Sequence, residues 1–307
     1  MHEPWPLAKK QRTLALRARI VGELRRFFAA RDYLEIETPC LIPAPAPEFH
    51  IDTMACEGWF LHPSPELCMK RLLAAGYDRI FQICRCFRKG ERGARHLPEF
   101  TMLEWYRREA DYRDLMVECE ELLIEAAAAL GYGDVVTYQG EPLRLGKPWE
   151  RLTVSEAFTR FAPLPAADAL AGDCFDEILA VYVEPWLGRG KPTFLYDYPL
   201  PLASLAREKQ GEPAIAERFE LYMAGIELAN AFTELAEERE QRRRFAREEE
   251  ARRKAGKPPY PSPDKFLESL TDIGDAAGIA LGVDRLVMIL ADAPDIDAVT
   301  AFTPETL

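Results

Sequence analysis

The hydrophobic residues near the start of the chain follow a helical period and then a strand period. Apolar residues recur every three or four positions over residues 13–31, with arginine and glutamate between them, which predicts an amphipathic helix. Residues 33–39 alternate between apolar and polar and stop at Pro39, a pattern typical of a strand. Helical spacing returns over residues 65–76 and 112–131. The pattern therefore predicts three helices and one strand here.

Two further stretches predict antiparallel hairpins. Residues 79–88 and 99–106 both alternate, and the loop GERGARHLP between them is polar, charged and glycine-bearing. Strands near 217–222 and 226–235 form a second pair, turned at Ala224-Gly225. Because the strands fall mostly in hairpins, an α+β fold with an antiparallel β-sheet flanked by helices is favoured over a parallel doubly wound sheet.

The remaining segments complete a single predicted domain over residues 1–307. Residues 151–161 begin a helical segment, and 236–254 form a helix so rich in charge that a solvated face is expected. The run GIALGVDRLVMIL (278–290) predicts a strand or loop entering an apolar helix. No internal repeat and no clean domain boundary interrupt the pattern.

Composition excludes several classes of protein. The chain has 307 residues, 48% hydrophobic and 29% charged, which rules out disorder, a collagen-like repeat and a fibrous coil. With 39 Lys+Arg against 51 Asp+Glu the net charge is −12. A protein that grips a long stretch of phosphate backbone usually has a basic surface, so this balance disfavours such a role.

The cysteines and the N-terminal region favour a cytoplasmic protein. The seven cysteines are an odd set without repeated spacing, and Cys84-Arg85-Cys86 lacks a second cysteine or histidine cluster to complete a zinc site. Reduced thiols are therefore expected. The first twenty residues contain no apolar signal-peptide core, and no run approaches the ~18 apolar residues of a membrane span.

Three clusters combine charge with regular structure. The first is the loop after Arg88, a residue whose rigid fork on a strand end suits a phosphate or carboxylate, although a solvated turn is the alternative. The second is the acidic hairpin containing Glu220 and Glu227, where paired carboxylates suggest Mg²⁺ unless they line an exposed strand edge. The third is the glycine-bearing turn before Arg285, which by itself indicates only packing.

In this order the clusters resemble the motifs of class II aminoacyl-tRNA synthetases. The helix and strand ending at Pro39 resemble motif 1, the dimer-forming element; FRKGERGARHLPEFTMLEWY resembles motif 2 and GIALGVDRLVMIL motif 3. SPELCMKRLL, IELANAFTEL and PEFTMLEWY narrow the resemblance to the lysyl branch. Only a dozen residues precede the motif 1 helix, whereas the anticodon-binding OB-fold of lysyl-tRNA synthetases needs roughly 100.

Without an anticodon-binding domain, the chain most resembles the elongation factor P–(R)-β-lysine ligase family, a truncated lysyl-tRNA synthetase paralogue. The run EWYR at 104–107 and Ala280, where lysyl-tRNA synthetases usually have glycine, fit that family. The resemblance implies ATP and Mg²⁺ as cofactors, (R)-β-lysine as substrate, elongation factor P as protein partner, a homodimer formed through the motif 1 region, and no use of tRNA. It further implies an adenylate intermediate, from which a lysine ε-amine of the partner displaces AMP.

The resemblance also assigns residues to the nucleotide. Arg88, Glu227 and Arg285 are the expected catalytic residues, with Arg88 on the α-phosphate and substrate carboxylate. The expected ATP-binding residues are Arg88, Lys89, Gly90, Glu91, Arg95, His96, Leu97, Phe100, Glu227, Leu228, Gly282 and Arg285. The usual acid of motif 2 is replaced by Gly90, and Leu97 replaces an asparagine, so Leu97 offers only its backbone to ATP.

A second set is assigned to the amino acid and the metal. Glu220 and Glu227 are expected to hold Mg²⁺. The expected substrate-binding residues are Ser64, Glu66, Glu104, Tyr106, Asn230, Glu234 and Ala280. For Glu227 and Asn230 to share one face, the strand 226–235 must contain a β-bulge between them.

Two other functions fit the same residues. One is a free-standing lysyl adenylate-former that charges tRNA or another acceptor. The other is a non-catalytic paralogue that senses an amino acid, although a sensor has no use for Mg²⁺ and an α-phosphate clamp.

Overall fold

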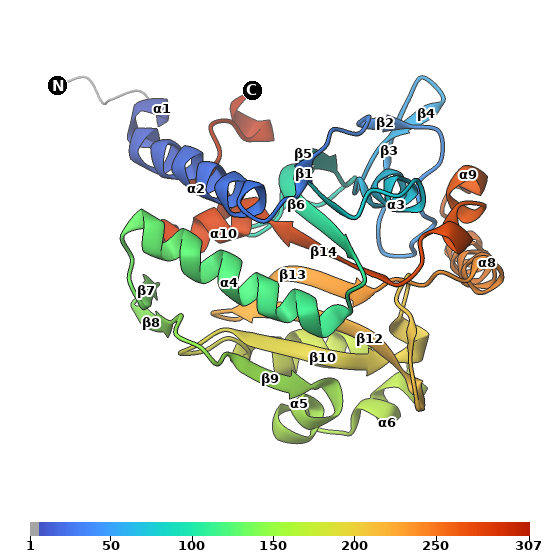
Figure 1. The fold of residues 1–307 in the computed structure, drawn as a ribbon. Helices are drawn as coiled ribbons and strands as arrows, with labels where there is room; N and C mark the ends of the chain where they lie inside the picture. Colours follow the sequence, from blue (N-terminus) through green and yellow to red (C-terminus); the bar gives the residue numbers. More distant parts are fainter. Residues whose placement is uncertain (1–5) are drawn as a thin grey trace.

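A nine-stranded sheet forms the centre of the computed structural model, which describes residues 6–307 (Figure 1). Residues 1–5 of the domain predicted over 1–307 lie outside the described part. All neighbouring pairs are antiparallel except β1–β5 and β9–β10, which are parallel. In spatial order the strands are β1 (Leu34–Glu35), β5 (Arg79–Phe87), β6 (Glu99–Arg108), β14 (Ala276–Gly282), β13 (Ile226–Thr233), β12 (Glu212–Met223), β10 (Thr193–Pro199) and β9 (Glu150–Thr153), with β11 (Glu208–Lys209) beside β12. The predicted α+β class is confirmed.

Within residues 6–307, two small sheets and ten α-helices surround this centre. The small sheets are β2 (Leu41–Ile42) with β4 (Trp59–Leu61) and β3 (Met54–Cys56), and β7 (Val135–Tyr138) with β8 (Glu141–Arg144). The helices are α1 (Pro6–Lys9), α2 (Gln11–Ala29), α3 (Glu66–Ala74), α4 (Tyr112–Leu130), α5 (Val154–Phe161), α6 (Ala166–Ala171), α7 (Phe175–Ile178), α8 (Glu238–Lys254), α9 (Asp264–Leu267) and α10 (Val283–Leu290). Among residues 6–307, no helix has both the length and the apolar character needed to cross a membrane.

The two faces of the sheet differ in chemistry. Helices α2, α4 and α10 cover one face, and their apolar side chains form the main core with strand residues such as Leu103, Trp105 and Ile279 (Figure 1). Since side chains alternate along a strand, the residues between these point to the opposite face. On that face Glu104 and Tyr106 alternate with the core residues of β6, so this is the face that carries the polar groups.

The predicted bulge in the second hairpin is confirmed. Leu221 pairs with Ala229 but Tyr222 pairs with Glu227, so Leu228 is the extra residue. Because Asn230 pairs with Glu220, two positions from Tyr222, the bulge places Glu227 and Asn230 on one face of the sheet. Leu228 itself is buried in the main core.

Most predicted elements lie within a few residues of their observed bounds, with two differences. The strand predicted over 33–39 is only Leu34–Glu35, because the chain then leaves β5 for the loop that begins at Pro39. The helix predicted from residue 151 begins at Val154, because residues up to Thr153 form β9 and the Thr153 side chain caps the helix with Glu156. Helix α8 carries the expected surface ion pairs, but its Arg252 is fully buried against Asp52.

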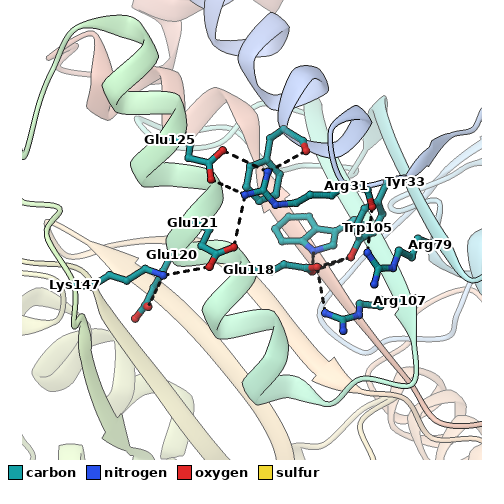
Figure 2. A network of polar contacts seen from close by, with 11 residues as sticks. Arg31, Tyr33, Arg79, Trp105, Arg107, Glu118, Glu120, Glu121, Glu125 and Lys147 are labelled. Carbon is teal, nitrogen blue, oxygen red and sulfur yellow. Dashed lines mark hydrogen bonds and ion pairs between the residues drawn. The ribbon is translucent and has the colours of Figure 1, made fainter.

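A buried polar contact attaches α4 to the sheet (Figure 2). Glu118 of α4 accepts hydrogen bonds from the Tyr33 hydroxyl at 2.8 Å and from Trp105 Nε1 at 3.1 Å. Arg107 lies 3.4 Å from the same carboxylate. About two turns further along α4, the exposed Glu125 pairs with Arg31. Glu118 therefore satisfies two buried donors that no apolar residue can satisfy.

Replacing Glu118 by alanine is expected to lower the free energy of unfolding by about 3 kcal/mol, since it leaves the Trp105 and Tyr33 donors unpaired. The matched control is Glu125→Ala on the same helix, which removes an exposed ion pair and should cost less than about 1 kcal/mol. Urea unfolding of both variants measures the difference. Equal losses would contradict the role given to Glu118.

Candidate active site

One row of residues crosses five strands of the polar face. Strand register pairs Gln82 with Glu104, Glu104 with Ala280, Ala280 with Asn230, and Asn230 with Glu220. Cross-strand partners point to the same face and lie about 5 Å apart. The row therefore joins three predicted substrate-binding residues to a predicted metal ligand in one continuous floor.

Glu104 is a buried carboxyl group surrounded by neutral donors. The Ser64 hydroxyl donates to Glu104 at 2.6 Å and the Tyr106 hydroxyl at 2.9 Å. Burial, with the charge of Glu66 as the second cause, raises the pKa of Glu104 to about 8. A cation in contact with this group would favour its ionised form.

A second pair of carboxylates meets a cation from the chain itself. Lys70 Nζ lies 2.5 Å from Glu66 and 2.5 Å from Glu234. Burial lowers the pKa of Lys70, but attraction to Glu234 and Glu66 outweighs it, so its pKa is raised. Burial also raises the pKa of Glu234 to about 8 despite Lys70, and Glu234 Oε1 has no hydrogen-bond partner in residues 6–307.

Glycine at position 278 lets Glu234 and Tyr106 come together. A Cβ atom there would lie 2.2 Å from the Tyr106 ring and 2.6 Å from Glu234 Oε1, so no larger residue fits without movement. Glu48, at the end of the proline-rich loop, faces the same region, and burial raises its pKa to about 7. Glu48, Glu66, Glu104 and Glu234 thus share one end of the floor, where the Lys70 ammonium group contacts only Glu66 and Glu234 among them. This end suits a ligand that brings positive charge.

The other end of the floor is lined by cations and an aromatic ring. The Arg88 guanidinium lies over the Phe100 ring at 5.1 Å, and its buried Nε has no hydrogen-bond partner in the described chain. Glu91 is 3.9 Å from Arg88. Lys89 and Gly90 follow on the loop, where Gly90 adopts a φ of 81°. An aromatic face and a guanidinium fork with an unpaired Nε suit a nucleotide base and a phosphate.

Arg285 connects the motif 2 loop to the acidic hairpin. Its Nη1 donates to the Glu227 carbonyl oxygen at 2.8 Å and lies 3.3 Å from the Glu227 carboxylate. Its Nη2 lies 2.6 Å from His96 Nε2, and its Nε donates to the Arg95 carbonyl oxygen at 3.3 Å. Burial and the charge of Arg285 lower the pKa of His96, so the ring is neutral at pH 7. A Cβ atom at Gly282 would lie 3.7 Å from the Arg285 side chain, an ordinary van der Waals contact.

The two acids predicted to hold metal differ in burial and in the number of their hydrogen-bond partners. Glu220 is buried and accepts hydrogen bonds from Tyr198, Tyr222 and Arg218 at 2.7, 2.6 and 2.7 Å. The Glu227 side chain is 40% exposed, and its one ion pair among the described residues is with the Arg285 guanidinium. Mg²⁺ takes one or two carboxylates and completes its shell with phosphate and water oxygens, so this oxygen donor set fits Mg²⁺.

Several functional residues were not predicted from the sequence. Lys70 sits four residues after Glu66 on one helix face, a spacing that signals an ion pair. Arg218 lies two positions before Glu220 on one strand, a spacing that places both side chains on the same face, where they form an ion pair. No feature of the sequence pointed to Glu184. Burial raises its pKa, and the charges of Glu220 and Glu227 raise it further. Leu97 and Leu228, both predicted to bind ATP, are buried in the core and offer only backbone atoms.

Cys84 and Cys86 were expected to lack a second cysteine or histidine cluster, and the structure places one histidine beside them. His62, more than twenty residues earlier in the chain, lies against both, and one ligand atom from each of the three residues lies within 4.8 Å of the others. A hydrogen bond from the Cys86 thiol lowers the pKa of Cys84 to about 6. All seven cysteines are free thiols, as predicted.

Comparison with known proteins agrees with this geometry. The family model of class II tRNA synthetases (D, K and N) matches residues 7–306. The elongation factor P–(R)-β-lysine ligase of Salmonella gallinarum is 39% identical over 319 residues, covering 97% of both chains. The ligase of the same name from Salmonella paratyphi B is 38% identical, again over 97% of both. The chain therefore belongs to the class II tRNA synthetases of the D, K and N type and, within them, to the group of the elongation factor P–(R)-β-lysine ligases.

Proposed function

We propose that this chain is an ATP-dependent amino-acid–protein ligase that activates (R)-β-lysine as an adenylate and transfers it to a lysine ε-amine of elongation factor P. One observation carries the proposal. The same sheet face holds an excess of buried carboxyl groups around Glu104 and, next to it, the cations Arg88 and Arg285. A substrate with two ammonium groups fits the first end, and a nucleotide triphosphate fits the second.

In the first reaction, a carboxylate oxygen of the amino acid attacks the α-phosphorus of ATP, and the bond to the bridging oxygen breaks to release pyrophosphate. The residues act by positioning and by stabilising charge. The Arg88 fork binds the α-phosphate and the attacking carboxylate, while Phe100 stacks on adenine. Arg285, held by Glu227, lies against the nucleotide from the other side, and the loop residues Arg95 and His96 meet the distal phosphates.

Magnesium is assigned to the acids at the nucleotide end. Glu227 would hold the ion with support from Glu220, whose oxygens Tyr198, Tyr222 and Arg218 orient. When bound, the ion neutralises charge that accumulates on the phosphate oxygens. In the second reaction the partner's lysine ε-amine, in its neutral form, attacks the carbonyl carbon of the adenylate; an amide bond forms and AMP leaves.

Substrate preference is assigned to the middle of the floor. The Ala280 methyl group lies between Glu104 and Asn230 in strand register, where it narrows the space above the sheet. This narrowing favours the altered backbone of a β-amino acid over that of α-lysine. Ser64, Glu66, Tyr106 and Glu234 complete the pocket, with Lys70 fixing the two carboxylates.

Assembly and location belong to the same proposal. The edge strand β1 leaves Leu34 51% exposed, with the exposed Tyr77 beside it, and the motif 1 region that contains β1 is the proposed homodimer interface. The enzyme works in the cytoplasm with elongation factor P as its protein partner and does not use tRNA.

Mass spectrometry of intact elongation factor P tests the function. After incubation with the enzyme, ATP, Mg²⁺ and (R)-β-lysine, the factor should gain one lysyl mass, because the adenylate is consumed by its lysine. Arg88→Ala should give no product, whereas the exposed helix variant Arg253→Ala should match the wild type. Charging of tRNA without modification of the factor would contradict the proposal and identify a free-standing adenylate-former.

Amino-acid binding is expected to strengthen as the pH rises from about 6 to 8. In this range the free enzyme holds Glu104 protonated, because its pKa is about 8, whereas a bound ammonium group favours the carboxylate. Binding therefore releases a proton, and affinity should rise by up to about tenfold per pH unit. Calorimetry in buffers of different ionisation enthalpy counts this proton.

The matched variant is Glu104→Gln, which keeps the shape of the group but cannot ionise. It should bind (R)-β-lysine more weakly and release about one proton fewer below pH 8. Binding to the wild type that releases no proton in this range would show that Glu104 does not meet the substrate ammonium.

A further inference from the structure

A second cluster of ligating side chains lies beside the floor. His62 follows β4, and Cys84 and Cys86 lie on β5, on the face that also carries Arg88 two residues later. The two sulfur atoms are 3.9 Å apart, and one ligand atom from each residue lies within 4.8 Å of the other two. Within residues 6–307 no other group of three histidine, cysteine or acidic residues is this compact.

The His62 ring is oriented with one nitrogen available. His62 is fully buried, and its Nε2 lies 2.7 Å from the Arg85 carbonyl oxygen. A carbonyl oxygen can only accept, so Nε2 carries the hydrogen and Nδ1 keeps its lone pair in the neutral ring. Nδ1 is buried and has no hydrogen-bond partner in the described chain. This buried imidazole nitrogen beside two thiols is therefore available to a ligand.

The backbone fixes this arrangement in advance. The His62 N–H donates to the Cys40 carbonyl oxygen at 2.8 Å, and the His62 carbonyl oxygen accepts from the Phe87 N–H at 3.0 Å. His62 is therefore attached on one side to the segment before β2 and on the other to the strand that carries both cysteines. The Arg85 carbonyl supplies the outer hydrogen bond that metal-ligating histidines usually have.

We propose that His62 Nδ1, Cys84 Sγ and Cys86 Sγ bind a thiophilic cation of the Zn²⁺ type, a site separate from the oxygen donors around Glu227. Two thiolates and an imidazole match the ligands that Zn²⁺ prefers, whereas Mg²⁺ prefers oxygen. Three protein ligands leave a fourth position for water, and Cys84 is the half-buried member of the cluster. Each thiol loses its proton to solvent when the metal–sulfur bond forms.

Occupation of this site joins two segments that carry substrate-binding residues. His62 precedes Ser64 by two positions, and Cys86 precedes Arg88 by two. A metal bond between the segments therefore holds the Ser64 turn against the strand that ends at Arg88. The prediction is that Zn²⁺ raises the melting temperature of the enzyme without ATP or amino acid present, because the ion binds the folded chain.

The test uses the full-length enzyme, stripped of metal and kept reduced with a phosphine. Added Co²⁺ should give one equivalent of a complex with thiolate-to-cobalt charge-transfer absorption, and Zn²⁺ should displace it. Affinity for Zn²⁺ is measured by competition with a chromophoric chelator. Cys84→Ser, Cys86→Ser and His62→Gln should each weaken it by at least about 100-fold, the upper end of the loss seen for outer-shell groups.

The controls are Cys56→Ser and His50→Gln, exposed residues outside the cluster, which should bind Zn²⁺ as the wild type does. Zn²⁺ should also raise the melting temperature of these two but not of the cluster variants. A wild-type enzyme without the charge-transfer band would overturn the proposal, whatever the folding of the variants. Equal Zn²⁺ affinity in the wild type and in well-folded cluster variants would overturn it as well.

Discussion

Buried carboxyl groups without full compensation are the constraint around which this site is built. Lys70 neutralises part of the charge of Glu66 and Glu234, but Glu104 meets only the hydroxyl groups of Ser64 and Tyr106. Moving a carboxylate out of water is costly, so Glu104 and Glu234 stay partly protonated until a cation arrives. Because a ligand's ammonium group offsets the cost of burying these carboxylates, the site selects ligands that carry ammonium groups.

The sheet makes this chemistry possible by setting strand register. The row from Gln82 to Glu220 is continuous only because the pairs on both sides of β14 stay in phase across the sheet. The bulge at Leu228 then turns Glu227 back onto the polar face, where Arg285 reaches it. Helices α2, α4 and α10 bury the opposite face, and contacts such as Glu118 with Trp105 hold them there. Substrate chemistry and stability are therefore assigned to opposite faces.

Sequence patterns predicted the hairpins and the main helices, because alternation and helical spacing are local properties of the chain. The bulge was predicted instead from the family resemblance, which requires Glu227 and Asn230 on one face. Sequence patterns did not predict the neighbours of the polar groups. The contact of Lys70 with Glu234 joins two distant segments, so helical spacing alone does not reveal it. Glu48 follows a loop that has no periodic pattern. His62 meets Cys84 only through the pairing of β2 with β4 and the contact of that segment with β5. Such contacts depend on tertiary structure, which no single stretch of sequence encodes.

The most direct measurement compares ATP–pyrophosphate exchange supported by (R)-β-lysine with exchange supported by the same β-amino acid lacking its terminal amine. The two acids differ only in one ammonium group, so the comparison isolates the charge that the buried carboxyl groups require. Exchange with the shortened acid should be at least about 100-fold slower at equal concentration, since it leaves an acid of the pocket unpaired. Equal exchange with both acids would contradict the central claim, because the pocket would then select by shape alone.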